Sequence, residues 1–137
     1  PPERRASGAK RRLRVLLVDD HEATRTILAR LLTRDGHIVY PAANLREARV
    51  VATQVCDAVI SDLGLPDGSG CELMLEIKRA HGWPGLALSG YGQEEDLARS
   101  REAGFSAHLT KPIDGARLRR ALGEITRALA SDVPADN

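Results

Sequence analysis

The segment AVISDLGLPDGSG, residues 58–70, begins with an apolar run that ends in one carboxylate, Asp62, and continues into a loop rich in Gly and Pro. The segment RVLLVDDHEA, residues 14–23, repeats this pattern, because its apolar run is followed directly by Asp19 and Asp20. Short apolar runs of this kind are typical of strands that are buried on both faces of a parallel sheet. Two such strands that end in acids indicate a shared site rather than two unrelated turns.

Helical patterns alternate with apolar runs along the rest of the chain. Five successive βα units predict an α/β fold with a parallel sheet and right-handed crossovers. The fourth helical segment, near 93–103, has only two apolar anchors. The predicted strands lie at about 14–18, 38–42, 58–61, 86–89 and 107–109. The apolar faces of the helices comprise Ile27, Leu28, Leu31 and Leu32; Leu45, Ala48, Val51, Ala52 and Val55, after the capping pair Asn44 and Glu47; Leu73, Met74 and Ile77; Leu97 and Ala98; and Leu118, Ala121, Leu122, Ile125 and Leu129.

The composition is typical of one globular domain, with 137 residues of which 42% are hydrophobic and 28% charged. No apolar run approaches the ~20 residues that a membrane-spanning helix needs, and no signal-peptide pattern is present. Only 3% of the residues are aromatic, which disfavours stacking on nucleic-acid bases. Cys56 and Cys71 lack the spacing of a metal site, so we expect reduced thiols in a cytoplasmic protein.

The two ends of the chain differ in composition from the rest. Residues 1–12 contain five basic residues and one acid together with Pro, Gly and Ser, which predicts a flexible basic linker. An arm that binds nucleic acid or membrane is the less favoured alternative. Residues 13–130 carry the alternating pattern and form the predicted domain, and residues 131–137 are predicted to be a tail.

Polar side chains follow four of the predicted strands. Asp19 and Asp20 come after the first strand, Asp62 ends the third, Ser89 ends the fourth and Lys111 follows the fifth. Because ligands bind at the carboxyl ends of parallel strands, we expect these residues to share a site. Clustered carboxylates repel each other unless a cation lies among them, and oxygen ligands favour Mg²⁺. A carboxylate beside Mg²⁺ and an ammonium can attack phosphorus and become an aspartyl phosphate, to which a hydroxyl can donate a hydrogen bond.

Four motifs together make the chain resemble the receiver domains of two-component response regulators. They are LLVDD (16–20), DLGLPDGSG (62–70), ALSG (87–90) and LTKP (109–112), in the order of the family. The resemblance implies a flavodoxin-like (βα)5 three-layer sandwich whose five parallel strands are ordered 2-1-3-4-5. It also implies a cytoplasmic phosphorelay protein that takes a phosphoryl group from a histidine kinase or a histidine phosphotransfer domain and itself contacts neither nucleic acid nor membrane.

The resemblance assigns a role to each motif residue. Asp62 would be the phosphoacceptor of a domain that catalyses its own phosphorylation and dephosphorylation. The Lys111–Pro112 peptide bond would be cis, which is affordable only before proline. The ligands of Mg²⁺ would be Asp19, Asp20, Asp62 and the backbone carbonyl of Gly64, and the residues that contact the phosphoryl oxygens would be Ser89 and Lys111.

His108 departs from the family pattern, which usually has Tyr or Phe three residues before the lysine as a switch. We hypothesise that Ser89 and His108 form the switch: phosphorylation draws Ser89 toward Asp62 and opens room for the imidazole to move inward. The surface made by the fourth helix, fifth strand and fifth helix would then change for a partner, with the weakly anchored fourth helix moving most. The alternative is that His108 lies on the surface and the domain signals through simpler loop closure.

Other readings of the same residues fit less well. A phosphohydrolase with an Asp nucleophile commonly has a second Asp two residues later, whereas Gly64 follows Asp62 and His21 follows Asp19 at that distance. A dinucleotide-binding domain needs a Gly-rich turn after its first strand, whereas VDDHEA would repel a pyrophosphate. Asp19 and Asp20 could also serve only to cap the first helix.

The chain begins without Met, so we expect it to be part of a longer protein. The basic segment before the domain favours the C-terminal receiver of a hybrid sensor histidine kinase. A stand-alone receiver and the N-terminal receiver of a multidomain regulator are the alternatives.

Overall fold

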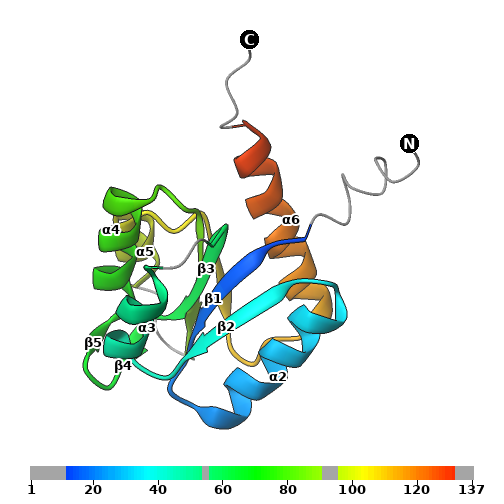
Figure 1. The fold of residues 1–137 in the computed structure, drawn as a ribbon, viewed down its shortest axis with the longest axis horizontal. Helices are drawn as coiled ribbons and strands as arrows, with labels where there is room; N and C mark the ends of the chain where they lie inside the picture. Colours follow the sequence, from blue (N-terminus) through cyan, green and yellow to red (C-terminus); the bar gives the residue numbers. More distant parts are fainter. Residues whose placement is uncertain (1–11, 54–55, 91–95, 132–137) are drawn as a thin grey trace.

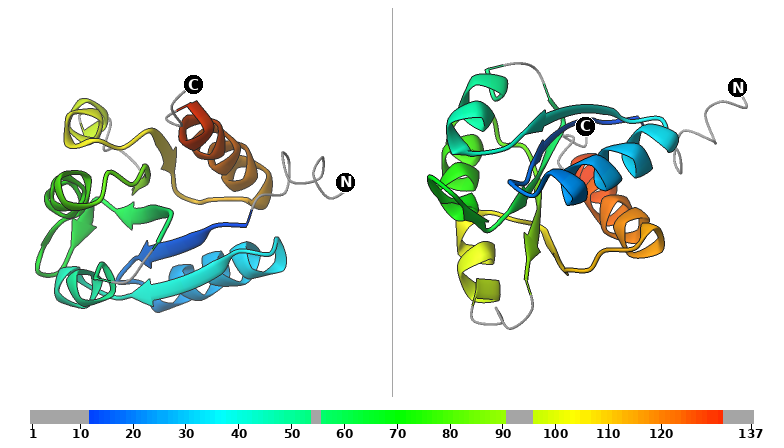
Figure 2. Two further views of the ribbon diagram at one scale, coloured as in Figure 1. Left: turned by 45° about the horizontal axis from the view of Figure 1, so that its top comes forward. Right: turned by 90° about the horizontal axis from the view of Figure 1, so that it is seen from below.

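The computed structural model describes residues 12–53, 56–90 and 96–131, which form three layers (Figure 1). A parallel sheet separates two helices on one face from three on the other, as Figure 2 shows from two further directions. The predicted linker 1–12 and tail 131–137 lie outside the described residues, apart from Arg12 and Ser131. Val55 and the start of the predicted fourth helix, residues 93–95, lie outside them as well.

The central sheet contains five parallel strands in the order β2-β1-β3-β6-β7. Numbered along the chain within this sheet, the order is 2-1-3-4-5, which confirms the predicted flavodoxin-like topology. A small antiparallel hairpin of β4 (Gly64–Leu65) and β5 (Gly68–Ser69), which the sequence did not predict, follows β3. The five strands are β1 (Arg14–Val18), β2 (Ile38–Ala42), β3 (Ala58–Asp62), β6 (Gly85–Ser89) and β7 (Ala107–Thr110).

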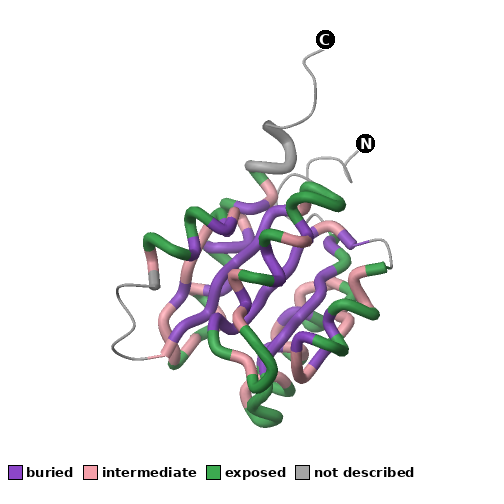
Figure 3. Tube along the Cα trace, turned by 90° about the vertical axis from the view of Figure 1, so that its left-hand side faces the viewer, coloured by how far each residue is buried: buried purple, intermediate pink, exposed green. Residues whose placement is uncertain are grey.

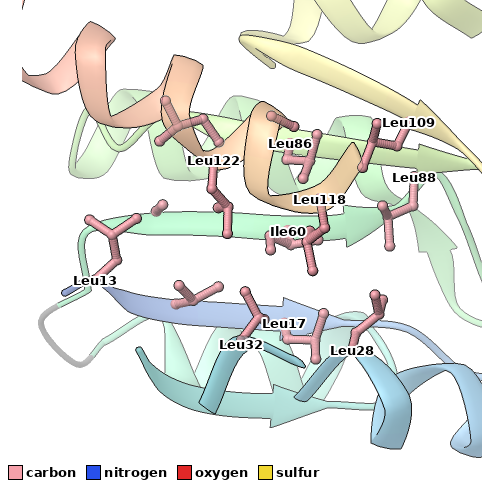
Figure 4. Close-up of a cluster of buried hydrophobic side chains, with 14 residues drawn as sticks. Leu13, Leu17, Leu28, Leu32, Ile60, Leu86, Leu88, Leu109, Leu118 and Leu122 are labelled. Carbon is pink, nitrogen blue, oxygen red and sulfur yellow. The ribbon is translucent and has the colours of Figure 1, made fainter. Parts of the chain in front are cut away.

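Apolar side chains on both faces of the strands hold the layers together. One cluster of buried residues lies between the sheet and the helices α2 (Glu22–Arg34) and α6 (Gly115–Ser131), with Ile60 and Leu86 of the sheet at its centre (Figure 4). A second cluster lies under α3 (Leu45–Val51), α4 (Gly70–Ala80) and α5 (Asp96–Ala103). Each fully buried Leu or Ile contributes roughly 1.5–3 kcal/mol. The buried trace in Figure 3 follows the strands, so the core fixes the positions of the strand ends.

The helix boundaries follow local signals in the sequence. The side chain of Asn44 accepts a hydrogen bond from the backbone N–H of Glu47 at 2.8 Å, and Glu47 accepts one from Ala43 at 2.7 Å, as the predicted capping pair requires. α2 ends before Gly36, whose φ of 96° is a left-handed conformation that favours glycine. No helix in the described ranges has the length and apolar content needed to cross a bilayer.

Two details of the predicted helix packing are wrong. Ile27 is 55% exposed, whereas Leu28 and Leu32 of its predicted face are buried in the core and Leu31 packs against it. In α5, Leu97 is half-buried and Ala98 is exposed, whereas Ser100 and Ala103 are buried. The helix therefore rests on small side chains, one of which, Ser100, satisfies its hydroxyl by donating to the carbonyl of Leu97.

Candidate functional site

The side chains predicted to share a site come from the carboxyl ends of neighbouring strands. Asp19 follows β1, Asp62 is the last residue of β3, Ser89 is the last residue of β6, and Lys111 follows β7. The register places Val18 beside Ser61 and Asp62 beside Leu88, so these ends are level with one another. Parallel pairing alone thus brings residues that are far apart in the sequence to one edge.

Lys111 joins two of the acids. Its Nζ donates a hydrogen bond to Oδ2 of Asp62 at 2.8 Å and lies 3.0 Å from Oδ2 of Asp19. Burial opposes the charge of this ammonium, but the hydrogen bond to Asp62 and the charges of both carboxylates outweigh it and raise the pKa of Lys111 above its ordinary value. Lys111 is therefore a cation at neutral pH, positioned where negative charge gathers. Its peptide bond to Pro112 is cis, as expected.

Asp19 is fully buried and only partly satisfied by the chain. Its Oδ1 accepts from the backbone N–H of His21 at 2.9 Å, whereas its Oδ2 faces Lys111 without accepting a hydrogen bond of good geometry from any described residue. His21 is the N-cap residue of α2 and no side chain caps that helix, so the acids do not serve simply as helix caps. A buried carboxylate oxygen whose cationic neighbour, Lys111, is shared with a second acid is a suitable ligand for a further cation.

The residues around Asp19 fit a magnesium ion. Possible ligand atoms of Asp19, Asp20 and His21 all lie within 4.8 Å of one another. Asp20 is exposed to solvent, which leaves the site open to a hydrated ion and to a phosphate. Two carboxylates with an open side match the preference of Mg²⁺ for oxygen ligands and retained waters.

Asp62 is held in place through its backbone and its side chain. Oδ1 accepts from the backbone N–H of Gly64 at 3.2 Å, and the main-chain carbonyl accepts from the hydroxyl of Ser61 at 2.9 Å. Gly70, the first residue of α4, packs directly against the same carbonyl, and its N–H donates to the carbonyl of Leu63 at 2.9 Å. The side chain of Asp62 is 12% exposed, so its carboxylate can still be reached from solvent.

Ser89 and His108 are hydrogen-bonded. Ser89 Oγ lies 2.7 Å from His108 Nε2, and the backbone carbonyl of Ser89 accepts from the N–H of Lys111 at 2.8 Å. The two residues of the hypothesised switch are therefore in direct contact. His108 is half-buried rather than on the surface.

Two polar contacts near the site were not anticipated from the sequence. Arg25 donates from Nη1 to the backbone carbonyl of Asp19 at 2.8 Å, which ties α2 to the acidic loop. Asp67, in the turn between β4 and β5, accepts from the backbone N–H groups of Leu45 and Arg46 at 2.8 and 3.1 Å. The Asp67-Gly68 pair predicts a turn, but nothing in the sequence indicates that its carboxylate caps a helix 21 residues away.

Comparisons with known proteins agree with this geometry. The response regulator receiver domain profile matches residues 15–123. An uncharacterised 14.6 kDa protein of Leptolyngbya boryana is 33% identical over 86% of this chain and 93% of its own length. The sensory/regulatory protein RpfC of Xanthomonas campestris is 35% identical over 88% of this chain, which spans only 18% of that protein. The crystal structure of a CheY-like receiver domain from Methanospirillum hungatei has a TM-score of 0.81 and 26% identity, over 86% of this chain and 96% of its own.

Proposed function

This chain belongs to the response regulator receiver domain family of two-component systems, and we propose that it takes a phosphoryl group onto Asp62 from a phosphohistidine. The donor would be a histidine kinase or a histidine phosphotransfer protein. The observation that carries the proposal is the position of Lys111, whose ammonium lies within 3.0 Å of the carboxylates of both Asp62 and Asp19. A structural ion pair would need only one acid for this lysine. Because two acids share the one ammonium, the excess negative charge favours a site that binds a further cation.

The proposed step follows from the groups around Asp62. A carboxylate oxygen of Asp62 attacks phosphorus, a P–O bond forms, and the P–N bond to the donor's imidazole breaks, with its electron pair returning to the ring. Lys111 balances charge on the phosphoryl oxygens as the bond to Asp62 forms, and the N–H of Gly64 holds the remaining carboxylate oxygen. Ser89 then donates a hydrogen bond from its hydroxyl to the phosphoryl group.

Magnesium is the cofactor of this proposal. Asp19, Asp20 and Asp62 would hold it together with the backbone carbonyl of Gly64. When bound, Mg²⁺ neutralises the carboxylates and polarises the phosphoryl group toward attack. The fully buried Asp19 supports the assignment, because its Oδ2 faces an ammonium that is shared with Asp62 and accepts no hydrogen bond of good geometry from the described residues.

The output surface is proposed to be the face made by α5, β7 and α6, with Ser89 and His108 as the switch. α5 is the element that supports this choice, because its contacts with the core rest on small side chains. Simpler loop closure around Asp62 remains the alternative output. In either case the proposed domain spans residues 13–130.

For the parent protein we propose a hybrid sensor histidine kinase with this domain at its C-terminal end, in the cytoplasm. The similarity to RpfC, a much longer sensory/regulatory protein, supports this assignment. The similarity to a relative of nearly the same length supports a stand-alone receiver as the alternative, and an N-terminal receiver of a regulator is the other. In all three the domain itself would contact a phosphodonor rather than nucleic acid or membrane.

Intact-mass analysis after incubation with acetyl phosphate tests the proposed function. We expect one phosphoryl group per chain in the presence of Mg²⁺ and none in excess chelator. Asp62→Asn should remain unlabelled. Asp57→Asn is a matched control directly before the start of the same strand, where Asp57 accepts from the backbone N–H of Arg14, and should label like the unmodified protein. Labelling of Asp62→Asn, or full labelling without metal, contradicts the assignment.

A further inference from the structure

We propose that the hydrogen bond between Ser89 and His108 is a latch that must open before Ser89 can donate to a phosphoryl group on Asp62. The inference rests on the proposed function. It adds a hydrogen-bonded restraint on Ser89 that a purely hydrocarbon aromatic side chain at position 108, such as Phe, could not supply. Its basis is the contact itself, 2.7 Å between Ser89 Oγ and His108 Nε2, between two side chains that are buried or half-buried.

The register of β6 and β7 fixes the direction of this bond. Ser89 lies beside Thr110, and His108 lies beside Ala87, two residues earlier on both strands. The hydroxyl of Ser89 is therefore bonded to a side chain that lies two residues before the carboxyl end of β7. Asp62 and Lys111, in contrast, lie at the carboxyl ends of the strands. Movement of the hydroxyl toward that edge lengthens its bond to His108.

In the proposed latch, Ser89 donates its single hydroxyl hydrogen to His108 Nε2 in the resting state, and a phosphoryl group on Asp62 would compete for that same hydrogen. Ser89 is 1% exposed, so in the resting state its hydroxyl is bonded to His108 and shielded from bulk water. A phosphoryl group on Asp62 that accepts from Ser89 would release the imidazole. The latch thus holds Ser89 away from Asp62 until Asp62 carries a phosphoryl group. Because this bond must be broken on binding, it lowers the affinity of the resting site for phosphoryl groups.

The released imidazole has a place to go. A cavity of about 260 Å³ adjoins His108, and its walls include Leu97 and Arg101 of α5 and Phe105 in the segment before β7. A rotation of the imidazole into this cavity changes its contacts with α5. The latch therefore connects phosphorylation to α5, the helix whose contacts with the core are made by small side chains.

Binding of beryllofluoride, a phosphoryl mimic, with Mg²⁺ tests the latch. His108→Leu keeps a side chain of similar size but cannot form the bond, whereas His108→Gln keeps a donor and an acceptor at a similar reach. Titration calorimetry should give roughly fivefold tighter binding to His108→Leu than to the unmodified protein, as loss of one hydrogen bond in the unbound state predicts. His108→Gln should bind within about twofold of the unmodified protein, because it preserves the latch.

A second pair of proteins separates the latch from a packing effect. In a Ser89→Ala background the change His108→Leu should have no effect on beryllofluoride affinity, because the bond is already absent. Equal or weaker binding by His108→Leu, or the same gain with and without Ser89, overturns the latch. Failure of the unmodified protein to bind beryllofluoride or to label on Asp62 overturns the proposed function instead, so the two failures are distinguishable.

Discussion

Lys111 Nζ lies 2.8 Å from Asp62 Oδ2, although the two residues are 49 positions apart in the sequence. The same ammonium lies 3.0 Å from Oδ2 of Asp19, so one cation is shared by the acids at the ends of two central strands. This arrangement leaves more negative than positive charge at the site. Substitution of each of these residues is therefore expected to have a different effect on metal binding and on phosphoryl transfer.

Replacing Lys111 by Ala should leave Mg²⁺ binding unchanged or tighter, because a cation that competes for Asp62 and Asp19 is gone. Phosphoryl transfer from acetyl phosphate should slow by at least about 100-fold, since no ammonium balances the developing charge. Calorimetry with Mg²⁺ and the time course of intact mass measure the two effects. Lys78→Ala, an exposed lysine of α4, is the control and should change neither. A loss of metal affinity in Lys111→Ala would count against this role.

Replacing Ser89 by Ala should leave phosphorylation of Asp62 possible but weaken its conformational effect. The hydroxyl is proposed to sense the phosphoryl group rather than to attack it. Amide NMR spectra with and without beryllofluoride should show shifts near Asp62 but much smaller ones in residues 96–103 and 107–110 than the unmodified protein shows. Ser106→Ala, an exposed serine next to β7, should behave like the unmodified protein. Undiminished shifts in α5 and β7 would exclude Ser89 as the sensor.

Replacing Gly70 by Ala should disturb the phosphoacceptor without touching its side chain. A Cβ at this position would collide with the backbone carbonyl of Asp62 and lie 2.9 Å from Oγ of Ser61. Relief requires a shift of the end of β3 or the start of α4, at about 1–3 kcal/mol in the free energy of unfolding. Urea unfolding and the phosphorylation rate should both worsen. Gly123→Ala in α6, whose Cβ would meet only Arg127 at 3.9 Å, should be neutral or stabilising by up to ~1 kcal/mol.

His37 should make stability depend on pH. Its Nδ1 accepts from the backbone N–H of Leu13 at 3.0 Å, and burial lowers its pKa from the ordinary value, against a weaker raising effect of Asp35. The unfolded chain takes up this proton near pH ~6.5, whereas the folded protein does so only at lower pH. Stability is therefore lost as the pH falls below ~6.5 toward the folded pKa.

His37→Asn keeps an acceptor for Leu13 but cannot titrate. Between about pH 7.5 and 5.5 it should lose less free energy of unfolding than the unmodified protein, as urea titrations at each pH would measure. Equal losses in both proteins would show that the histidine is not the source of the dependence. The other three histidines are present in both proteins and cancel in the comparison.

The sequence pattern by itself determined the layers and the set of candidate residues, and the resemblance of four motifs to a known family supplied the strand order. Runs such as 15–18 and 58–60 are apolar at every position, and only a strand covered on both faces buries all of them. Strands built this way must be connected by helices that return to the opposite end, so the acids at 19 and 62 had to meet at one edge. The layers and the shared edge need only local pattern and chain order.

The tertiary structure decided which atoms pair with which. Lys111 bonds to Asp62 and lies beside Asp19, Ser89 bonds to His108, and Asp67 caps the distant helix α3. It also decided that Ile27 faces solvent although it lies among the apolar residues of α2. Such partners depend on strand register and on how each helix is rotated over the sheet, and both are set by packing of the whole core. A hydrogen bond between remote residues leaves no periodic trace in either segment, and for this reason the sequence names the members of the site but not their contacts.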